Sequence, residues 1–254
     1  MLDQLVSGSV FAFLAVFARI GSTLMLLPGF GEAYVAPRIR LGLALVLSFT
    51  LMPVVGGSVP AMPDSVWRLL LVLGNEIGIG LFLGTLARLM LLALNVAGTI
   101  IAFQTSLANA LANDPTSAQQ ASISATFLMA LGVLLIFASN LHYLMFRAMV
   151  DSYAVFPPGT LPIIGDMADL VTRTVSASFM LAVQIAAPFL VIGLVFYLGL
   201  GLLARLMPQV QVFFIAMPAQ ILVGFVLLLL GTSAAMLWFL DHFEGVLQPF
   251  VLRS

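Results

Sequence analysis

The sequence contains no cysteine and no lysine, and it is short of charge of either sign. Without cysteine the chain has no disulfide, thiolate metal site or cysteine nucleophile. Only 7% of its 254 residues are charged, whereas about a quarter are charged in a soluble domain. The chain is therefore not a soluble domain. Its net charge of −1 also excludes a broad surface for nucleic acid or anionic lipid.

Groups that carry catalysis are equally scarce. The two histidines, His142 and His242, are far apart in sequence and have few polar neighbours, which argues against a histidine metal site. The sequence shows no Ser–His–Asp constellation, no mid-membrane carboxylate pair and no phosphate-binding loop. We therefore expect no catalytic residue, no cofactor and no metal, and an intramembrane enzyme is the least favoured class of function.

What the chain has instead is apolar length, with 62% apolar residues and a mean hydropathy of +1.19. A helix of about 20 apolar residues spans a bilayer and satisfies its own backbone hydrogen bonds. The prediction is an all-α membrane protein of about six long hydrophobic helices arranged as hairpins. The six runs are Ser9–Leu27, Leu41–Met52, Val66–Leu94 with a continuation to Phe103, Ile123–Met149, Val175–Leu206 and Val212–Leu240.

Two connections between these runs are informative. Residues 151–174 are rich in proline and glycine, and they are predicted to form the longest loop. Pro208-Gln209 leaves only a tight turn between the last two runs, which predicts an antiparallel helical hairpin. No hydrophilic block is large enough to fold apart from the membrane part, so residues 1–254 are predicted to be a single membrane domain.

One long polar segment, Gly98–Gln120, interrupts the apolar runs. It is either an exposed loop or polar backbone held at membrane depth inside an assembly. A secondary transporter with broken helices would use residues 98–120 as an unwound binding segment. Against that alternative, the two halves of the chain show no evident inverted repeat.

Glycines recur in two of the runs, and in the third run they form two pairs one helical turn apart, at 74/78 and 80/84. Small residues at this spacing let helix backbones approach closely. We therefore predict helix packing, and not a ligand site, at Gly74, Gly78, Gly80 and Gly84 in the third run and at Gly193, Gly199 and Gly201 in the fifth.

Three ionisable residues, Arg19, Glu76 and Arg88, lie inside apolar runs. A charge at the centre of a membrane helix costs at least ~2.5–3.5 kcal/mol and usually faces protein or water. Glu76 and Arg88 would be about 18 Å apart along one helix and about 120° around it, so they cannot pair. The favoured interpretation is pairing between subunits, or a helix end outside the hydrocarbon. A proton or ion path is the alternative.

Three segments resemble the FliR family of bacterial flagellar export subunits, with the related injectisome subunit as the close alternative. They are Pro37–Leu43, then Ala97-Gly98 followed by Gln104 and Asp114-Pro115, and finally Leu198–Gln209 continuing into Val212–Pro218. The resemblance covers nearly the whole chain, in the same order and at the same spacing.

The resemblance implies a non-enzymatic structural subunit of the flagellar type III export channel, in the bacterial inner membrane at the flagellar basal body. The implied partners are FliP and FliQ in a helical hetero-oligomer, FlhB and FlhA nearby, unfolded flagellar export substrates and membrane lipid, with no nucleic acid. A FliP-like part (1–174) would precede a FliQ-like hairpin (175–254). Family cores also stand largely out of the membrane plane.

In the family the loop after the third run projects into the lumen as a plug. The corresponding candidates are Phe103, Gln104, Ser106, Asn109, Asn113, Asp114 and Pro115. This plug is more polar than the family pattern, so we expect its seal to rest on neighbouring subunits. The turn between the last two helices is the predicted partner contact, through Arg205, Pro208, Gln209 and Gln211.

Overall fold

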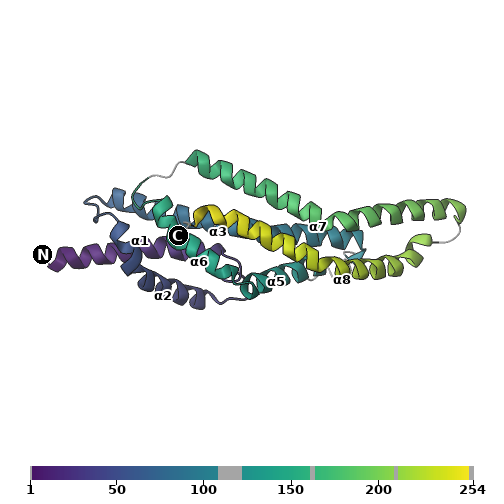
Figure 1. Cartoon of the computed structure of the whole chain (residues 1–254), viewed down its shortest axis with the longest axis horizontal. Coiled ribbons are helices and arrows are strands. Elements are labelled where there is room, and N and C mark those ends of the chain that lie inside the picture. The colour runs from purple at the N-terminus through teal and green to yellow at the C-terminus, as the bar shows by residue number, and fades with distance from the viewer. Residues whose placement is uncertain (1, 108–121, 161–163, 209–210, 252–254) are drawn as a thin grey trace. The chain divides into compact units, whose positions relative to one another are not determined.

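The computed structural model describes residues 2–107, 122–160, 164–208 and 211–251 (Figure 1). Within these ranges every regular element is a helix. The elements are α1 (Leu2–Leu26), α2 (Pro37–Val55), η1 (Gly56–Ser58), α3 (Val66–Gln104), α5 (Ile123–Ala138), α6 (Leu141–Val155), α7 (Ile164–Leu206), α8 (Val212–Leu247) and η2 (Gln248–Phe250). Five helices of the described chain are long and apolar enough to cross a membrane, or six if α5 and α6 form one broken span. The predicted all-α membrane fold is confirmed.

The chain divides into two compact units. The first unit holds residues 1–89, 136–174 and 243–254, and the second holds residues 90–135 and 175–242. Several long helices, α3 and α7 among them, contribute to both units. The predicted division into a FliP-like part and a FliQ-like hairpin stays a prediction.

In the first unit, α1 and the start of α3 run parallel. Arg19 pairs with Glu76, and Glu32, just after α1, pairs with Arg88 further along α3. Residue numbers therefore rise in the same direction along both helices. Helix α2 packs on α1 and carries the chain back from the end of α1 toward the start of α3. From Val66 to Arg88 the helix rises about 34 Å, close to the thickness of one bilayer crossing. This part of α3 alone suffices for one span.

Aromatic and aliphatic side chains fill the core of the first unit. Phe82 of α3 packs edge-on against Phe156 and Phe250, with ring centroids 6.1 and 5.9 Å away. Such edge-to-face pairs add to the free energy gained by burying the rings. Phe250 belongs to η2, so the C-terminal end of the described chain is anchored in the core by its side chain.

The fourth apolar run is two helices, not one. Residues 123–149 were predicted as a single run, but α5 ends at Ala138 and α6 begins at Leu141. Asn140 has a φ of 62°, a left-handed conformation that asparagine tolerates better than most residues and that ends a helix. Hydropathy continues across this break, so the only sequence signal was the Ser139-Asn140 pair.

The predicted long loop at residues 151–174 is also wrong at both ends. Helix α6 continues to Val155 and α7 begins at Ile164. Met167, Leu170 and Val171 follow a helical spacing and pack against the core of the first unit. The polar residues between them lie on the other face of an amphipathic helix and do not mark a loop.

In the second unit, α7 and α8 form an antiparallel hairpin (Figure 1). Gln220 of α8 lies within hydrogen-bonding distance of Tyr197 of α7. Nearer the open end of the hairpin, Pro188 and Gly231 line one pocket. Positions that meet are therefore at similar distances along the sequence from the turn at Pro208. The hairpin predicted from this turn is confirmed.

Candidate functional site

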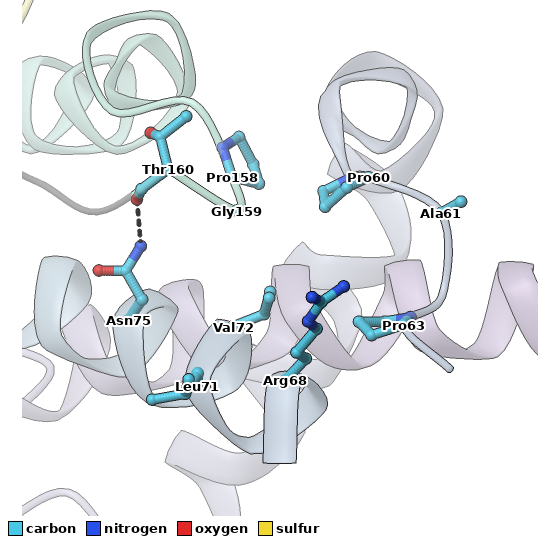
Figure 2. Close-up of a pocket in the computed structure, with 10 residues that line it drawn as sticks. All are labelled: Pro60, Ala61, Pro63, Arg68, Leu71, Val72, Asn75, Pro158, Gly159 and Thr160. Atoms are coloured by element: carbon cyan, nitrogen blue, oxygen red, sulfur yellow. Dashed lines mark hydrogen bonds between the residues drawn. The ribbon is translucent and has the colours of Figure 1, made fainter. Parts of the chain in front are cut away.

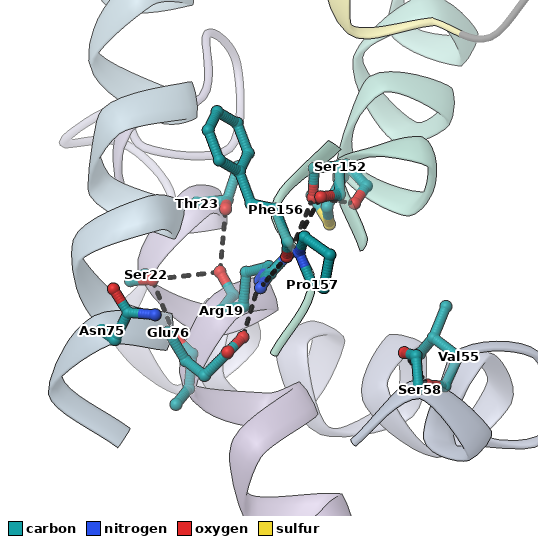
Figure 3. Close-up of polar contacts among 12 residues, drawn as sticks. Arg19, Ser22, Thr23, Val55, Ser58, Asn75, Glu76, Ser152, Phe156 and Pro157 are labelled. Carbon is teal, nitrogen blue, oxygen red and sulfur yellow. Dashed lines mark hydrogen bonds and ion pairs between the residues drawn. The ribbon is translucent and has the colours of Figure 1, made fainter. Parts of the chain in front are cut away.

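A fully buried arginine ties together three helices of the first unit. Arg19 of α1 and Glu76 of α3 have no exposed side-chain surface, and Arg19 Nε donates a hydrogen bond to Glu76 Oε2 at 2.7 Å (Figure 3). The guanidinium carbon lies 4.1 Å from the ring centre of Tyr153 in α6, as in a cation–π contact. We call Arg19, Glu76, Ser152, Tyr153 and Phe156 the arginine clamp.

The remaining donors of Arg19 point at the C-terminal end of α6 (Figure 3). Nη1 donates to the carbonyl and hydroxyl oxygens of Ser152 at 3.1 and 3.3 Å, and Nη2 donates to the carbonyl of Phe156 at 2.9 Å. The last carbonyls of a helix commonly lack partners within it, although the Ser152 carbonyl also accepts the Phe156 N–H at 2.8 Å. Arg19 therefore caps α6 while Glu76 neutralises its charge, which is how a protein tolerates a buried guanidinium.

The arginine clamp contains one carboxylate and lacks a second in series. Glu76 Oε1 and the Tyr153 hydroxyl are buried without a hydrogen-bond partner in the described chain. No group of three or more histidine, cysteine or acidic residues among the described residues could hold a metal. The geometry therefore suits joining helices better than relaying protons.

The expected pairing of these charges between subunits is corrected, because both pairs form within the chain. Besides the Arg19–Glu76 pair, Arg88 Nη1 lies 2.7 Å from Glu32 Oε1 in the turn after α1. The carbonyls of the same turn are held by Arg40, which donates to Phe30, Glu32 and Val35 at 3.0, 3.0 and 3.3 Å. Arg40 thus gives the Pro37–Leu43 motif a structural role.

A buried glutamine joins helices of the second unit in a similar way. Gln220 of α8 is only 4% exposed. Its Nε2 donates to the carbonyl of Gln104 at 2.6 Å and lies 3.4 Å from the Tyr197 hydroxyl, while its Oε1 accepts from the Ser106 hydroxyl at 2.8 Å. Gln104 is the last residue of α3. We call Gln220, Gln104, Ser106 and Tyr197 the glutamine clamp.

Two glycines let the end of α3 approach the hairpin closely. A Cβ on Gly193 of α7 would overlap the Gln104 side chain, and a Cβ on Gly224 of α8 would overlap the Thr105 side chain. Just beyond, Ser106 has a φ of 58° and ends the helical path. The end of α3 is therefore fixed against both helices of the hairpin.

The plug candidates fall into two groups. Gln104 and Ser106 belong to the glutamine clamp, whereas the ring of Phe103 is 65% exposed and takes no part in it. The other candidates, Asn109, Asn113, Asp114 and Pro115, lie outside the described residues. Sequence reasoning missed Gln220, although a lone amide within the apolar run Val212–Leu240 was the available signal.

The predicted packing glycines also fall into two groups, those with a close neighbour and those without one. Gly80 and Gly84 of α3 lie against α1, where a Cβ on Gly84 would be 2.7 Å from Leu26 Cβ and 2.9 Å from the Thr23 carbonyl. A Cβ on Gly80 would overlap Ser22 Oγ and the carbonyl oxygen of Arg19. Gly193 lies against Gln104, as described above, whereas a Cβ on any of the remaining four would have nothing from the described chain within 4 Å: Gly74, Gly78, Gly199 and Gly201.

The predicted partner contact lies at the exposed tip of the hairpin. Arg205, Pro208 and Gln211 are exposed, and Gln209 lies outside the described residues. Apolar side chains continue along the same end of α7 with large exposed fractions, including Leu202 at 67% and Leu206 at 78%. So much exposed apolar helix, with charges that are buried only in pairs, defines an integral membrane protein of packed helices.

Comparison with known proteins identifies the family of membrane proteins that this chain resembles. The family model of bacterial export proteins, family 1, matches residues 10–246. The flagellar biosynthetic protein FliR of Caulobacter vibrioides is 39% identical over 95% of this chain and 96% of its own length. FliR of Bacillus subtilis is 29% identical over 87% and 86%, and Yop proteins translocation protein T of Yersinia pestis is 25% identical over 91% and 89%.

The chain therefore belongs to the bacterial export proteins of family 1, and the resemblance to the FliR family is confirmed. The match spans both units of the fold.

Proposed function

We propose that the chain is a structural subunit of the flagellar type III export channel and that it helps to form and close the conduit for unfolded flagellar proteins. Family membership makes it a membrane-embedded component of a type III export apparatus. The flagellar system is favoured over the injectisome because the FliR of Caulobacter vibrioides is 39% identical and the Yersinia pestis translocation protein only 25%.

The glutamine clamp is the observation that carries the closing role. A segment that closes a conduit needs a fixed origin, and Gln220 holds the last carbonyl of α3 where the polar segment leaves the helix. Ser106, two residues further on, is held by the same side chain. The closing part itself, which includes Asn109 and Asp114, lies outside the described residues and belongs to the proposal.

The exposed apolar surface of the hairpin supports an assembly. Leu229 and Leu230 of α8 are 81% and 73% exposed, and Leu198 of α7 is 62% exposed. We propose that FliP and FliQ cover this surface, that FlhB meets the Pro208 turn and that FlhA lies nearby. The site of assembly would be the inner membrane at the flagellar basal body, and the FliQ-like part would be residues 175–254.

Purification in mild detergent, followed by measurement of the intact mass, tests the assembly. The expected result is a hetero-oligomer with other small helical membrane proteins, and an isolated chain that is unstable. A well-behaved monomer that transports a small solute would contradict the proposal and favour the transporter alternative.

Shortening the polar segment tests the closing role. A deletion of several residues between 108 and 117 leaves Ser106 and the glutamine clamp in place. The assembly should keep its mass while membranes that carry it become leaky to ions. An assembled deletion variant with unchanged conductance would remove the closing role and leave the structural role intact.

A further inference from the structure

Both helices of the α7–α8 hairpin carry a weak point partway along their length. Pro188 lies inside α7, where it donates no backbone hydrogen bond and its ring clashes with the preceding turn. In α8, Gly231 favours helix poorly, and the Thr232 hydroxyl donates to the Leu228 carbonyl, an interaction that often bends helices. Figure 1 shows both helices changing direction partway along the hairpin. Proline and glycine are among the usual causes of such kinks.

A cavity of about 260 Å³ lies between the two helices at this level. Pro188, Gly231 and Thr232 all line it, together with Ile101 of α3 and Leu128 of α5. A Cβ built on Gly231 has nothing from the described chain within 4 Å, so it would enter open space. Protein interiors hold few voids larger than a water molecule. The cavity therefore leaves the hairpin room to bend at the level where its helices are weakest.

The two arms of α7 on either side of Pro188 are held differently. Before the proline, Leu181 and Ala182 are fully buried. Beyond it, the arm meets the end of α3 through Gly193 and the glutamine clamp, while Leu202 further along is 67% exposed. The arm nearer the Pro208 turn is therefore attached to α3 by a small set of polar and close backbone contacts.

Helix α3 is itself fixed before it reaches the glutamine clamp. A Cβ on Gly98 would overlap the backbone of Ala125 in α5, so these two helices are in direct contact. Ser122, just before α5, also donates to the Gly98 carbonyl at 3.3 Å. A change in the bend of the hairpin would therefore carry Gln220 and Tyr197 away from an α3 that stays in place. Such a movement would break the glutamine clamp.

We propose that the hairpin bends at a hinge formed by Pro188, Gly231 and Thr232, and that the glutamine clamp holds it in the bend that the structure shows. A hinge needs only a few residues that absorb the change in backbone angles, and both helices have them at the same cavity. The hinge is a property of the hairpin. It stands whether or not the polar segment closes a conduit, because its test measures a distance and not a conductance.

The distance between two spin labels in the intact complex tests the hinge. The chain has no cysteine, so Ser176→Cys and Ala204→Cys place one label on each arm of α7, at exposed positions. A straight helix would hold these positions about 42 Å apart. In a complex of normal mass, Gln220→Leu should raise the population of a second distance at least about fivefold, because the bonds that hold one bend are lost. A complex whose chain lacks both cysteines supplies the background.

Pro188→Ala, added to Gln220→Leu, should return the distribution to a single distance. Alanine restores the backbone N–H and removes the clash of the ring, so α7 loses its weak point. Pro218→Ala is the matched control, since Pro218 also lies inside a helix of the hairpin but does not line the cavity. This control should keep both distances.

A second variant keeps α7 unchanged. Gly231→Leu fills the cavity from α8 and should also suppress the second distance. Ala61→Leu is its control, because Ala61 lines a different cavity, bordered by two loops and the start of α3 in the first unit (Figure 2). The proposal is overturned if Gln220→Leu shows the same single distance as the unsubstituted chain. It is also overturned if neither Pro188→Ala nor Gly231→Leu removes the second distance, or if Pro218→Ala removes it equally.

Discussion

The arginine clamp of the first unit and the glutamine clamp of the second perform the same task with different chemistry. Each donates to a backbone carbonyl at the C-terminal end of a helix, where carbonyls commonly lack a partner within the helix. Arg19 caps α6 through Ser152 and Phe156, whereas Gln220 caps α3 through Gln104. The difference is charge, since only Arg19 needs a counter-ion.

That difference implies unequal tolerance to change. Removing one partner of a buried ion pair leaves the other charge uncompensated, whereas removing a neutral amide leaves only unsatisfied polar groups. We therefore expect the packing of α1, α3 and α6 to fail when the arginine clamp is broken. The end of α3 should instead loosen locally when the glutamine clamp is broken.

Glu76→Gln is expected to have the largest effect. It leaves the Arg19 guanidinium buried without a counter-ion, at a cost of about 3–5 kcal/mol. The protein should fail to accumulate in membranes, as measured by immunoblot of the membrane fraction. Glu244→Gln is the matched control, because this carboxylate is exposed and bonds only Gln248 in the described chain. Equal accumulation of the two variants would show that Glu76 does not stabilise Arg19.

Replacing both charges should restore part of this loss. In Arg19→Met/Glu76→Met no charge is buried, and similar apolar replacements of buried ion pairs are often neutral. The Phe156 carbonyl would still lose its donor, at about 1–3 kcal/mol. The double variant should accumulate better than Glu76→Gln alone. The exchanged pair Arg19→Glu/Glu76→Arg should not recover, since a carboxylate would face the α6 carbonyls, and its full recovery would refute the capping role of Arg19.

Substitution of Gly80 in α3 should have an effect on stability of intermediate size, and Gly201 in α7 provides its control. Gly80→Ala drives a methyl group into the Arg19 carbonyl and should cost about 1–3 kcal/mol by overpacking. Gly201→Ala meets open space in the described chain and should not destabilise the isolated fold, since alanine favours helix by up to about 1 kcal/mol. Thermal unfolding of the two variants in detergent provides the measurement. An undiminished unfolding temperature for Gly80→Ala would mean that the α1–α3 contact is looser than described.

Among the substitutions expected to destabilise the protein, Gln220→Leu should have the smallest effect. The Gln104 carbonyl and the Ser106 hydroxyl lose their partner, at about 1–3 kcal/mol for a group left buried, and relaxation of a helix end lowers that cost. Hydrogen exchange at residues 101–106 should increase, while the amides of α1 keep their protection. Loss of protection in both units would contradict a local role for Gln220.

The outline of the fold follows from the sequence, because long apolar runs must become helices and a Pro208 turn joins the last two. The break at Asn140 does not follow, because hydropathy carries no information on a single left-handed residue. The start of α7 was missed because its amphipathic first turns resemble a polar loop. Such errors concern backbone geometry and not composition.

The clamps could not be predicted for a different reason. Arg19 and Glu76 are 57 positions apart, and Gln220 lies 116 positions from Gln104. Each pair depends on which helices lie side by side and at which height, and one sequence with long apolar runs permits many such arrangements. Polar residues in apolar runs indicated where partners were needed but not which residues supply them.

The most direct test of the closing role is the ion conductance of membranes that carry the assembled Gln220→Leu variant. If the glutamine clamp positions the closing segment, this complex should leak ions while its intact mass stays normal. Gln184→Leu is the control, since Gln184 of α7 is half-buried in the same unit and lies outside the clamp. A leak confined to Gln220→Leu is the predicted result. Equal, low conductance in both assembled variants would contradict the account.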